Sequence, residues 1–155
     1  MDELDRRILA VLQRDASLSV ERVAQEVGSS KSPVWARIKK LKDMGIIEKE
    51  VVLLDPEKID QTEVFFIAVK TDQHEADWLE RFSAAVQDMP EIQEAHRLAG
   101  EVDYLLKVRV KDTRAFDDFY KELVSRVRLF AVTSSLSMET LKSTTEMQLL
   151  EKSAD

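Results

Sequence analysis

The sequence predicts an α+β protein made of two domains, an N-terminal winged helix-turn-helix domain and a C-terminal ferredoxin-like βαββαβ domain. Apolar residues recur at helical spacing three times before residue 45, which is the pattern of three short helices. From residue 63 onward, strand patterns alternate with helix patterns. The charge changes near the same place, because residues 1–60 carry 11 basic and 12 acidic side chains, whereas residues 61–155 carry 12 and 18.

Composition excludes several classes of function. The chain of 155 residues has no cysteine, two histidines and three glycines. A disulfide framework, a thiolate metal site and a glycine-rich phosphate loop are therefore excluded. The acidic start lacks the apolar segment of a signal peptide, and no apolar run reaches the roughly 18 residues of a membrane span. We expect a cytoplasmic protein that works without a metal or cofactor and away from membranes.

The first two helices are short, and cap residues mark their ends. Acidic residues at positions 2–5 favour a helix N-terminus, and an apolar stripe runs from Leu4 to Leu12. Ser19 can cap a second helix, and Gly28 suits its C-terminal end. The second helix is only about two turns long, so it depends on packing against its neighbours.

The third helix begins after Ser30 or Ser32, either of which can act as its cap, and it ends at Gly45. Residues 50–56 then resemble a strand followed by a turn, and we expect them to form one side of a small wing. The spacing of apolar residues predicts that the buried stripe of the third helix consists of Val34, Ile38 and Leu41.

The third helix is also the predicted contact with double-stranded DNA. Residues 29–42 contain five cations and no acid within an acidic protein, so they can hold a polyanion locally. Two helices separated by a turn at Gly28, the second of them basic, form a helix-turn-helix, and a helix of this diameter fits the major groove of B-DNA. The residues predicted to contact DNA are Ser30, Lys31, Ser32, Pro33, Trp35, Arg37, Lys39, Lys40 and Lys42.

These residues have different expected roles. The cations are expected to anchor phosphates. Ser30 and Ser32 are expected to reach base edges. Lys39 or Arg37 are further candidates for base contacts. Trp35 can contact a thymine methyl group or a sugar, although a contact between domains or subunits is the more common use of such a residue.

The second domain is predicted to run strand, helix, strand, strand, helix, strand. This order folds most simply into a four-stranded antiparallel sheet with both helices on one face. The first of these helices is expected to bury a stripe of Leu79, Phe82, Val86 and Met89. The segments are expected at 64–69, 75–89, 92–98 and 104–110, then in a helix capped by Asp112 or Thr113 that reaches Val127, and at 132–138. The expected domain limits are 1–50 for the helix-turn-helix, 51–62 for the wing strand and linker, and 63–155 for the second domain.

One face of the predicted sheet has no helix to cover it, although many of its side chains are apolar or long-stemmed. An uncovered apolar sheet face in a water-soluble protein indicates association. We expect a second copy of the chain to cover it as a two-fold dimer. Such a dimer would present two recognition helices to two half-sites of DNA.

Several motifs along the chain occur together in one known family. In chain order they are Leu4–Leu9, Ser32–Leu41, Gly45-Ile46-Ile47, Leu54–Lys58, the Gly-x-x-Asp loop within Gly100–Tyr104, Val132–Ser135 and Leu141–Thr145. With these motifs in this order, nearly the whole chain resembles the Lrp/AsnC, or feast/famine, family of transcriptional regulators.

The resemblance implies a winged helix-turn-helix joined by a strand to an effector-binding domain, the RAM domain. It also implies dimers that assemble further into tetramers or octamers, and a small-molecule effector, typically an amino acid, bound in clefts between dimers. The effector-binding residues implied by position are Gly100, Glu101, Val102, Asp103, Tyr104, Thr133 and Ser135. The hydroxyl-rich stretch 132–138 departs from the family pattern, and it indicates a cleft that is more polar or smaller than usual.

The residues of the Gly-x-x-Asp loop support two interpretations. Gly100 permits a backbone conformation that a side chain would block, successive amides can cradle a carboxylate, and Asp103 can accept from an α-ammonium group. The alternative is that Asp103 only ties down its own turn through bonds to the backbone.

Two other classes of function remain as alternatives. Glu94 and His96 share a strand face and His74 lies in a nearby loop, so a sparse acid–base pair is conceivable, but we expect no enzyme because a lone histidine on a half-exposed strand is usually structural. The second alternative is an effector-sensing oligomer whose helix-turn-helix serves protein contacts and has no direct role on DNA.

Overall fold

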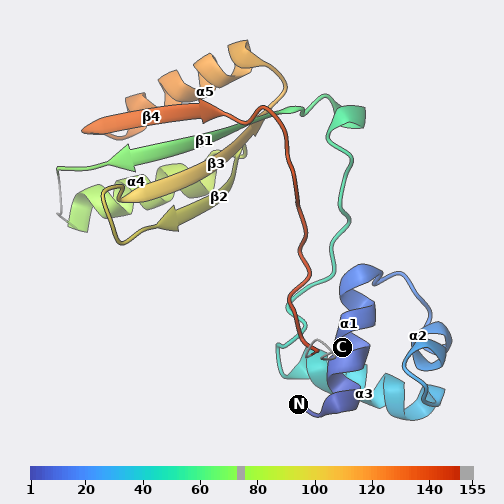
Figure 1. The fold of residues 1–155 in the computed structure, drawn as a ribbon. Helices are drawn as coiled ribbons and strands as arrows, with labels where there is room; N and C mark the ends of the chain where they lie inside the picture. The colour runs from blue at the N-terminus through green and yellow to red at the C-terminus, as the bar shows by residue number, and fades with distance from the viewer. Residues whose placement is uncertain (73–75, 151–155) are drawn as a thin grey trace. The chain divides into compact units, whose positions relative to one another are not determined.

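A computed structural model describes residues 1–72 and 76–150 of the chain, and it confirms the predicted α+β class. The chain forms two compact units (Figure 1). The first consists of Met1–Leu53 together with the segment that begins at Lys142, and the second consists of Leu54–Leu141. Within the described residues, no helix is long and apolar enough to cross a membrane.

The first unit contains the three predicted helices. They are α1 (Glu3–Arg14), α2 (Val20–Glu26) and α3 (Lys31–Asp43). Ser19 caps α2 as predicted, since its side chain accepts from the Arg22 N–H at 3.2 Å. Gly28 (φ +66°) and Gly45 (φ +68°) end α2 and α3 in left-handed conformations that glycine adopts without strain. The core of the unit is Ile8, Leu9, Val11, Val23, Ala24, Val27, Val34 and Leu41.

The predicted wing strand over residues 50–56 is wrong. The structure shows no strand there, and a short 3₁₀ turn (η1, Glu57–Ile59) follows. In Figure 1 this part of the chain is a connecting segment. Val51–Leu54, which supplied the strand pattern, are exposed, and none of them pairs with another strand in the described part of the chain. A β-strand requires a neighbouring strand to satisfy its backbone, so an apolar run alone does not create one.

The segment after Lys142 returns to the first unit and lies against α1. The side chain of Gln13 donates to the Met147 carbonyl at 3.1 Å and accepts from the Met147 N–H at 2.7 Å. Arg6 donates to the Leu149 carbonyl at 3.2 Å, and the Leu149 side chain packs on the core of the unit. The expected limit of 63–155 for the second domain therefore differs from the observed unit, which ends at Leu141.

The second unit has the predicted ferredoxin-like topology. Its elements are β1 (Glu63–Lys70), α4 (Ala76–Asp88), β2 (Ile92–Arg97), β3 (Tyr104–Val110), α5 (Thr113–Arg126) and β4 (Ala131–Leu136). All strand pairs are antiparallel, in the order β2-β3-β1-β4. Asp112 is the cap of α5, because its side chain accepts from the Ala115 N–H at 2.8 Å. Part of the loop before α4, including His74, lies outside the described residues.

Both helices pack on one face of the sheet. Alternate residues of β1 and β3, including Ile67 and Leu106, are buried beneath α4 and α5. The predicted buried stripe of α4 is partly wrong. Trp78 is buried in place of its neighbour Leu79, which is 41% exposed. The Trp78 ring stacks on Phe82, and its Nε1–H donates to the Arg128 carbonyl at 2.7 Å. A tryptophan whose one polar atom has a partner can be buried at little cost, so it displaces the leucine beside it.

The opposite face of the sheet carries a mixture of apolar and polar side chains. Phe66 of β1 lies on this face, 40% exposed, between Lys107 of β3 and Ser135 of β4 in the strand register. Ala68 lies next to Thr133 on the same face. Among residues 1–72 and 76–150, no helix packs on this side, which agrees with the predicted uncovered face.

Candidate nucleic-acid interface and effector region

Helix α3 divides into a packed face and an exposed face. Val34 and Leu41 are buried and Ile38 is half-buried, as predicted. Eight of the nine residues predicted to contact DNA are exposed, and the ninth, Arg37, is half-buried. The face of α3 that could meet DNA is therefore available on the surface of the first unit.

The N-terminus of α3 is open to a ligand. Ser30 is the cap residue, which decides between the two candidates, and its hydroxyl makes no capping bond within the described residues. Ser32 lies in the first turn and is exposed, and that turn holds no acidic residue. Backbone N–H groups at such a terminus are unpaired donors and attract phosphate oxygens.

Most of the lysines of α3 are free to turn toward an anion. Lys31 pairs with Glu21, and Lys42 Nζ lies 2.7 Å from Glu50 Oε1, but both pairs are exposed. Exposed pairs contribute about 0–1 kcal/mol, so exchanging them for a phosphate is easy. Lys39 Nζ lies 5.7 Å from the centre of the Trp35 ring. Lys40 forms no ion pair among the described residues.

Arg37, which is also predicted to contact DNA, forms ion pairs within the first unit. Its Nη1 lies 2.5 Å from Asp2 Oδ2 and 2.8 Å from Asp5 Oδ1, both at the start of α1. Asp5 is buried. The acids at the start of the first helix are visible in the sequence, but periodicity does not show which cation they meet.

The Gly-x-x-Asp loop is anchored to the end of β1. The Asp103 N–H donates to the Val69 carbonyl at 3.0 Å, and the Leu98 N–H donates to the Asp103 carbonyl at 2.8 Å. The Asp103 carboxylate accepts from the Thr71 N–H through Oδ2 at 2.8 Å. Oδ1 has no hydrogen-bond partner in the described part of the chain, so one oxygen remains for a ligand. Gly100 has φ +155°, a region that residues with a side chain rarely adopt.

The other predicted effector residues are not all gathered around this loop. Glu101 is exposed and Val102 is half-buried. The Tyr104 side chain is buried against Trp78 and Phe82, with ring centres 5.7 Å and 4.6 Å away, and therefore belongs to the core. Thr133 and Ser135 are exposed on the uncovered sheet face.

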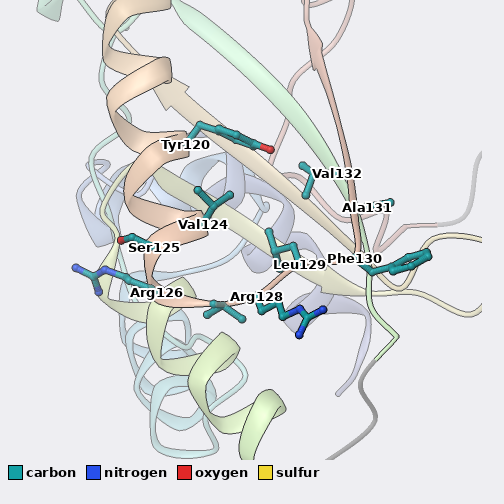
Figure 2. Close-up of a pocket in the computed structure, with 10 residues that line it drawn as sticks. Tyr120, Val124, Ser125, Arg126, Arg128, Leu129, Phe130, Ala131 and Val132 are labelled. Carbon is teal, nitrogen blue, oxygen red and sulfur yellow. The ribbon is translucent and has the colours of Figure 1, made fainter.

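A groove next to β4 was missed by the sequence analysis. It has a volume of about 450 Å³ and is lined by Tyr120 and residues 124–132 (Figure 2). The Phe130 N–H donates to the Lys70 carbonyl at 3.2 Å, so this groove and the Gly100–Asp103 loop are attached to the same end of β1. Phe130 is 67% exposed, and Arg128 forms no ion pair with another described residue. A helix end and a strand start line this groove, and neither carries a sequence motif that would predict it.

The proposed acid–base pair is an exposed electrostatic cluster. Glu94 Oε2 lies 3.5 Å from His96 Nε2, and Glu94 Oε1 accepts from Lys107 Nζ at 2.6 Å. The hydrogen bond from Lys107 lowers the pKa of Glu94, with a smaller contribution from His96. A glutamate held in its ionised form is a poor proton donor.

The geometry defines a class of two-unit protein. One unit presents a basic helix-turn-helix, and the other carries a ferredoxin-like sheet. Residues 1–42 match the AsnC-type helix-turn-helix domain, and residues 64–147 match the Lrp/AsnC ligand binding domain. The chain belongs to the Lrp/AsnC family, and it is a DNA-binding transcriptional regulator.

Relatives align along almost their whole length. The DNA-binding transcriptional activator DecR of Escherichia coli K12 is 44% identical over 150 residues, which cover 96% of this chain and 99% of DecR. The glutamate uptake regulatory protein of Zymomonas mobilis is 40% identical over 153 residues, which cover 99% of this chain and 93% of that protein. Proteins of this kind are transcriptional regulators rather than enzymes.

Solved structures agree with the fold. The crystal structure of an AsnC family transcriptional regulator from Agrobacterium tumefaciens has a TM-score of 0.93 at 44% identity, covering 96% of this chain and 97% of that one. A transcriptional regulator from Neisseria meningitidis, solved as a complex with L-methionine, has a TM-score of 0.92 at 34% identity with the same coverage.

Proposed function

We propose that this regulator binds operator DNA through the exposed face of α3 and changes its occupancy of DNA when an amino acid binds at the end of β1. The observation that carries the proposal is the composition of that face. Ser30, Ser32, Lys39 and Lys40 are exposed on it, and no acidic residue lies in the first turn. The remainder of the protein is acidic, so phosphate attraction is confined to this face.

Each part of α3 has a separate proposed role on DNA. Lys31, Lys39, Lys40 and Lys42 anchor phosphates, and they thereby fix the register of the helix on the duplex. Ser30 and Ser32, at the start of the helix, reach base edges in the major groove. Pro33 supports the first turn, where its missing N–H leaves no bond unmade. Trp35 is 54% exposed and lies on the same surface, where it is able to contact a sugar or a thymine methyl group.

The proposed effector site lies where the Gly100–Asp103 loop and the Arg128–Phe130 loop meet the end of β1. Asp103 Oδ1 is available to accept from the α-ammonium group of an amino acid. The amides near Gly100 are suited to its carboxylate. Glu101, Val102, Thr133 and Ser135 are proposed to line the remaining space when subunits assemble, whereas Tyr104 supports the loop from the core. The L-methionine in the Neisseria meningitidis regulator supports an amino acid as the ligand class.

Self-association is part of the proposal. The uncovered sheet face, with Phe66 at its centre, is proposed to pack against the same face of a second copy. A two-fold dimer presents two copies of α3 to two half-sites, and assembly of dimers occupies several sites at once. An effector that binds between dimers then favours one assembly over another and changes occupancy by linkage.

The direct test is a mobility shift with duplexes selected from a randomised pool by the purified protein. We expect binding whose affinity falls steeply with salt, because the lysines release counterions from DNA. If the helix-turn-helix instead serves protein contacts, as in the alternative function, the protein selects no duplex and shows no salt-dependent shift even in dilute buffer.

A further inference from the structure

A closed network of charges joins the start of α1 to the middle of α3. Asp2 and Asp5 form a reciprocal cap, in which the Asp2 N–H donates to Asp5 Oδ2 at 2.9 Å and the Asp5 N–H donates to Asp2 Oδ1 at 3.0 Å. The two remaining oxygens both accept from Arg37 Nη1, at 2.5 Å and 2.8 Å. Every oxygen of the two carboxylates therefore has a partner, and one guanidinium nitrogen completes the set.

The burial of this network holds Arg37 in place. Asp5 is the only charged residue that is buried among those described, with 8% of its side chain exposed, and 32% of the Arg37 side chain is exposed. If Arg37 turned away toward a phosphate, two adjacent carboxylates would remain, one of them buried without a cation. An uncompensated buried charge is strongly unfavourable. The hydrogen bond from Arg37 holds the pKa of Asp2 at about 2, in agreement with a tight pair.

The position of Arg37 on α3 points to the same role. It lies three residues after Val34 and four before Leu41, and both of these are buried, so Arg37 lies at the edge of the packed face. Lys39 and Lys40 lie on the exposed side of the helix. The guanidinium therefore fastens α3 to α1, while the cations that an approaching duplex would meet belong to the lysines.

We propose that Arg37 is a positioning residue, which fixes the orientation of α3 on α1 through Asp2 and Asp5 and makes no contact with DNA. The proposal rests on the proposed function, because it concerns the helix that reads DNA. Base readout depends on side chains held within a fraction of an ångström, whereas phosphate attraction tolerates small displacements. Loosening the network should therefore impair the discrimination between sequences before it impairs binding to DNA in general.

The test compares affinity for two duplexes, one selected from a randomised pool by the unaltered protein and one with the same bases scrambled. The variants Arg37→Gln and Asp5→Asn open the network from its two ends. Lys40→Gln is the matched control for a lost cation on α3, and Glu3→Gln for a lost acid in the first turn of α1. All measurements are made well below the melting temperature of every variant, so that the proteins compared are folded.

Positioning predicts a selective loss. Arg37→Gln and Asp5→Asn should each weaken binding to the selected duplex by about ten- to a hundredfold, the range that base contacts carry, and leave affinity for the scrambled duplex and the salt slope unchanged. The double variant should bind the selected duplex no more weakly than the single variant with the lower affinity, since either change already opens the network. Lys40→Gln should weaken binding to both duplexes alike and reduce the salt slope by about 0.9. Glu3→Gln should preserve the ratio of the two affinities.

Two results would overturn the proposal. If Arg37→Gln behaves like Lys40→Gln, Arg37 contacts a phosphate. If Asp5→Asn tightens binding to both duplexes, the acids only compete with DNA for Arg37. Should Arg37→Gln unfold the first unit, Asp2→Asn makes the same comparison, because it opens only the exposed half of the network. Failure of the unaltered protein to select any duplex is a different outcome, and it refutes the proposed function together with this inference.

Discussion

Two aspartates, one in each unit, are used in contrasting ways. In the first unit, both oxygens of Asp5 have partners, the Asp2 N–H and Arg37, and the side chain is buried. In the second unit, Asp103 is half-buried and one of its oxygens accepts from the Thr71 N–H, while Oδ1 has no partner in the described part of the chain. A carboxylate whose oxygens are all paired stabilises the fold, whereas one with a remaining oxygen is able to do so and still bind a ligand.

The largest predicted effect concerns the stability of the first unit. Replacing Arg37 by Leu leaves Asp5 buried beside Asp2 without a cation. We expect the free energy of unfolding to fall by about 2–3 kcal/mol. This is less than for a fully buried pair, because Arg37 is partly exposed. Hydrogen exchange of the amides in α1 and α3 measures this loss. Lys40→Leu is the matched control and should change stability by less than about 0.5 kcal/mol. Equal protection of these amides in the two variants would show that the network of Arg37, Asp2 and Asp5 contributes nothing to the stability of the first unit.

The next prediction concerns the ligand response of Asp103. In the unaltered protein, an amino acid present at about 100 times its Kd should raise stability by about 2.7 kcal/mol, and thermal unfolding with each of the twenty amino acids will identify it. Asp103→Asn retains an oxygen for the Thr71 N–H but loses the charge, so we expect an almost unchanged melting temperature and no response to the ligand. A response that survives in Asp103→Asn would limit this residue to tying down its loop.

A smaller loss of stability is expected where the segment after Lys142 lies against α1. Leu149→Ala removes a half-buried side chain from the core near α1, and we expect a loss of about 1 kcal/mol, less than for a fully buried leucine. Met147→Ala is the matched control, because its side chain is 74% exposed while its backbone makes the bonds to Gln13. Exchange of the α1 amides distinguishes the two variants, and equal effects would mean that Leu149 does not support the unit.

The smallest predicted effect depends on pH. The pKa of Asp2 is lowered to about 2, chiefly by the Arg37 hydrogen bond, and that of Asp5 is also lowered, chiefly by the Asp2 N–H. Groups with a lowered pKa in the folded state stabilise it above their ordinary value, near 3.8, and this contribution is lost as the pH falls toward the folded value. Urea unfolding between about pH 5 and pH 2 should therefore show a steeper loss in the unaltered protein than in Arg37→Leu, and identical profiles would contradict the pairing.

The sequence was sufficient to predict features that follow from local periodicity and caps. The three helices, the Ser19 cap, the strand order and the uncovered sheet face all belong to this group. The sequence was insufficient to predict contacts between segments that lie far apart in the chain, and it did not show which of two neighbouring side chains becomes buried. The partners of Arg37, the inward direction of Tyr104, the exchange of Leu79 for Trp78 and the attachment of Leu149 to α1 depend on tertiary packing, which periodicity does not encode.

The salt dependence of DNA binding is the most direct test of the central claim that the lysines of α3 hold the duplex. The affinity of the unaltered protein for one duplex is measured over a range of salt concentrations, and the measurement is repeated with the Lys39→Gln/Lys40→Gln double variant. We predict a linear fall of log affinity with log salt, and a slope that is smaller by about 1.8 in the variant because two phosphate contacts are lost. An unchanged slope, or no binding by the unaltered protein in dilute buffer, would contradict the account.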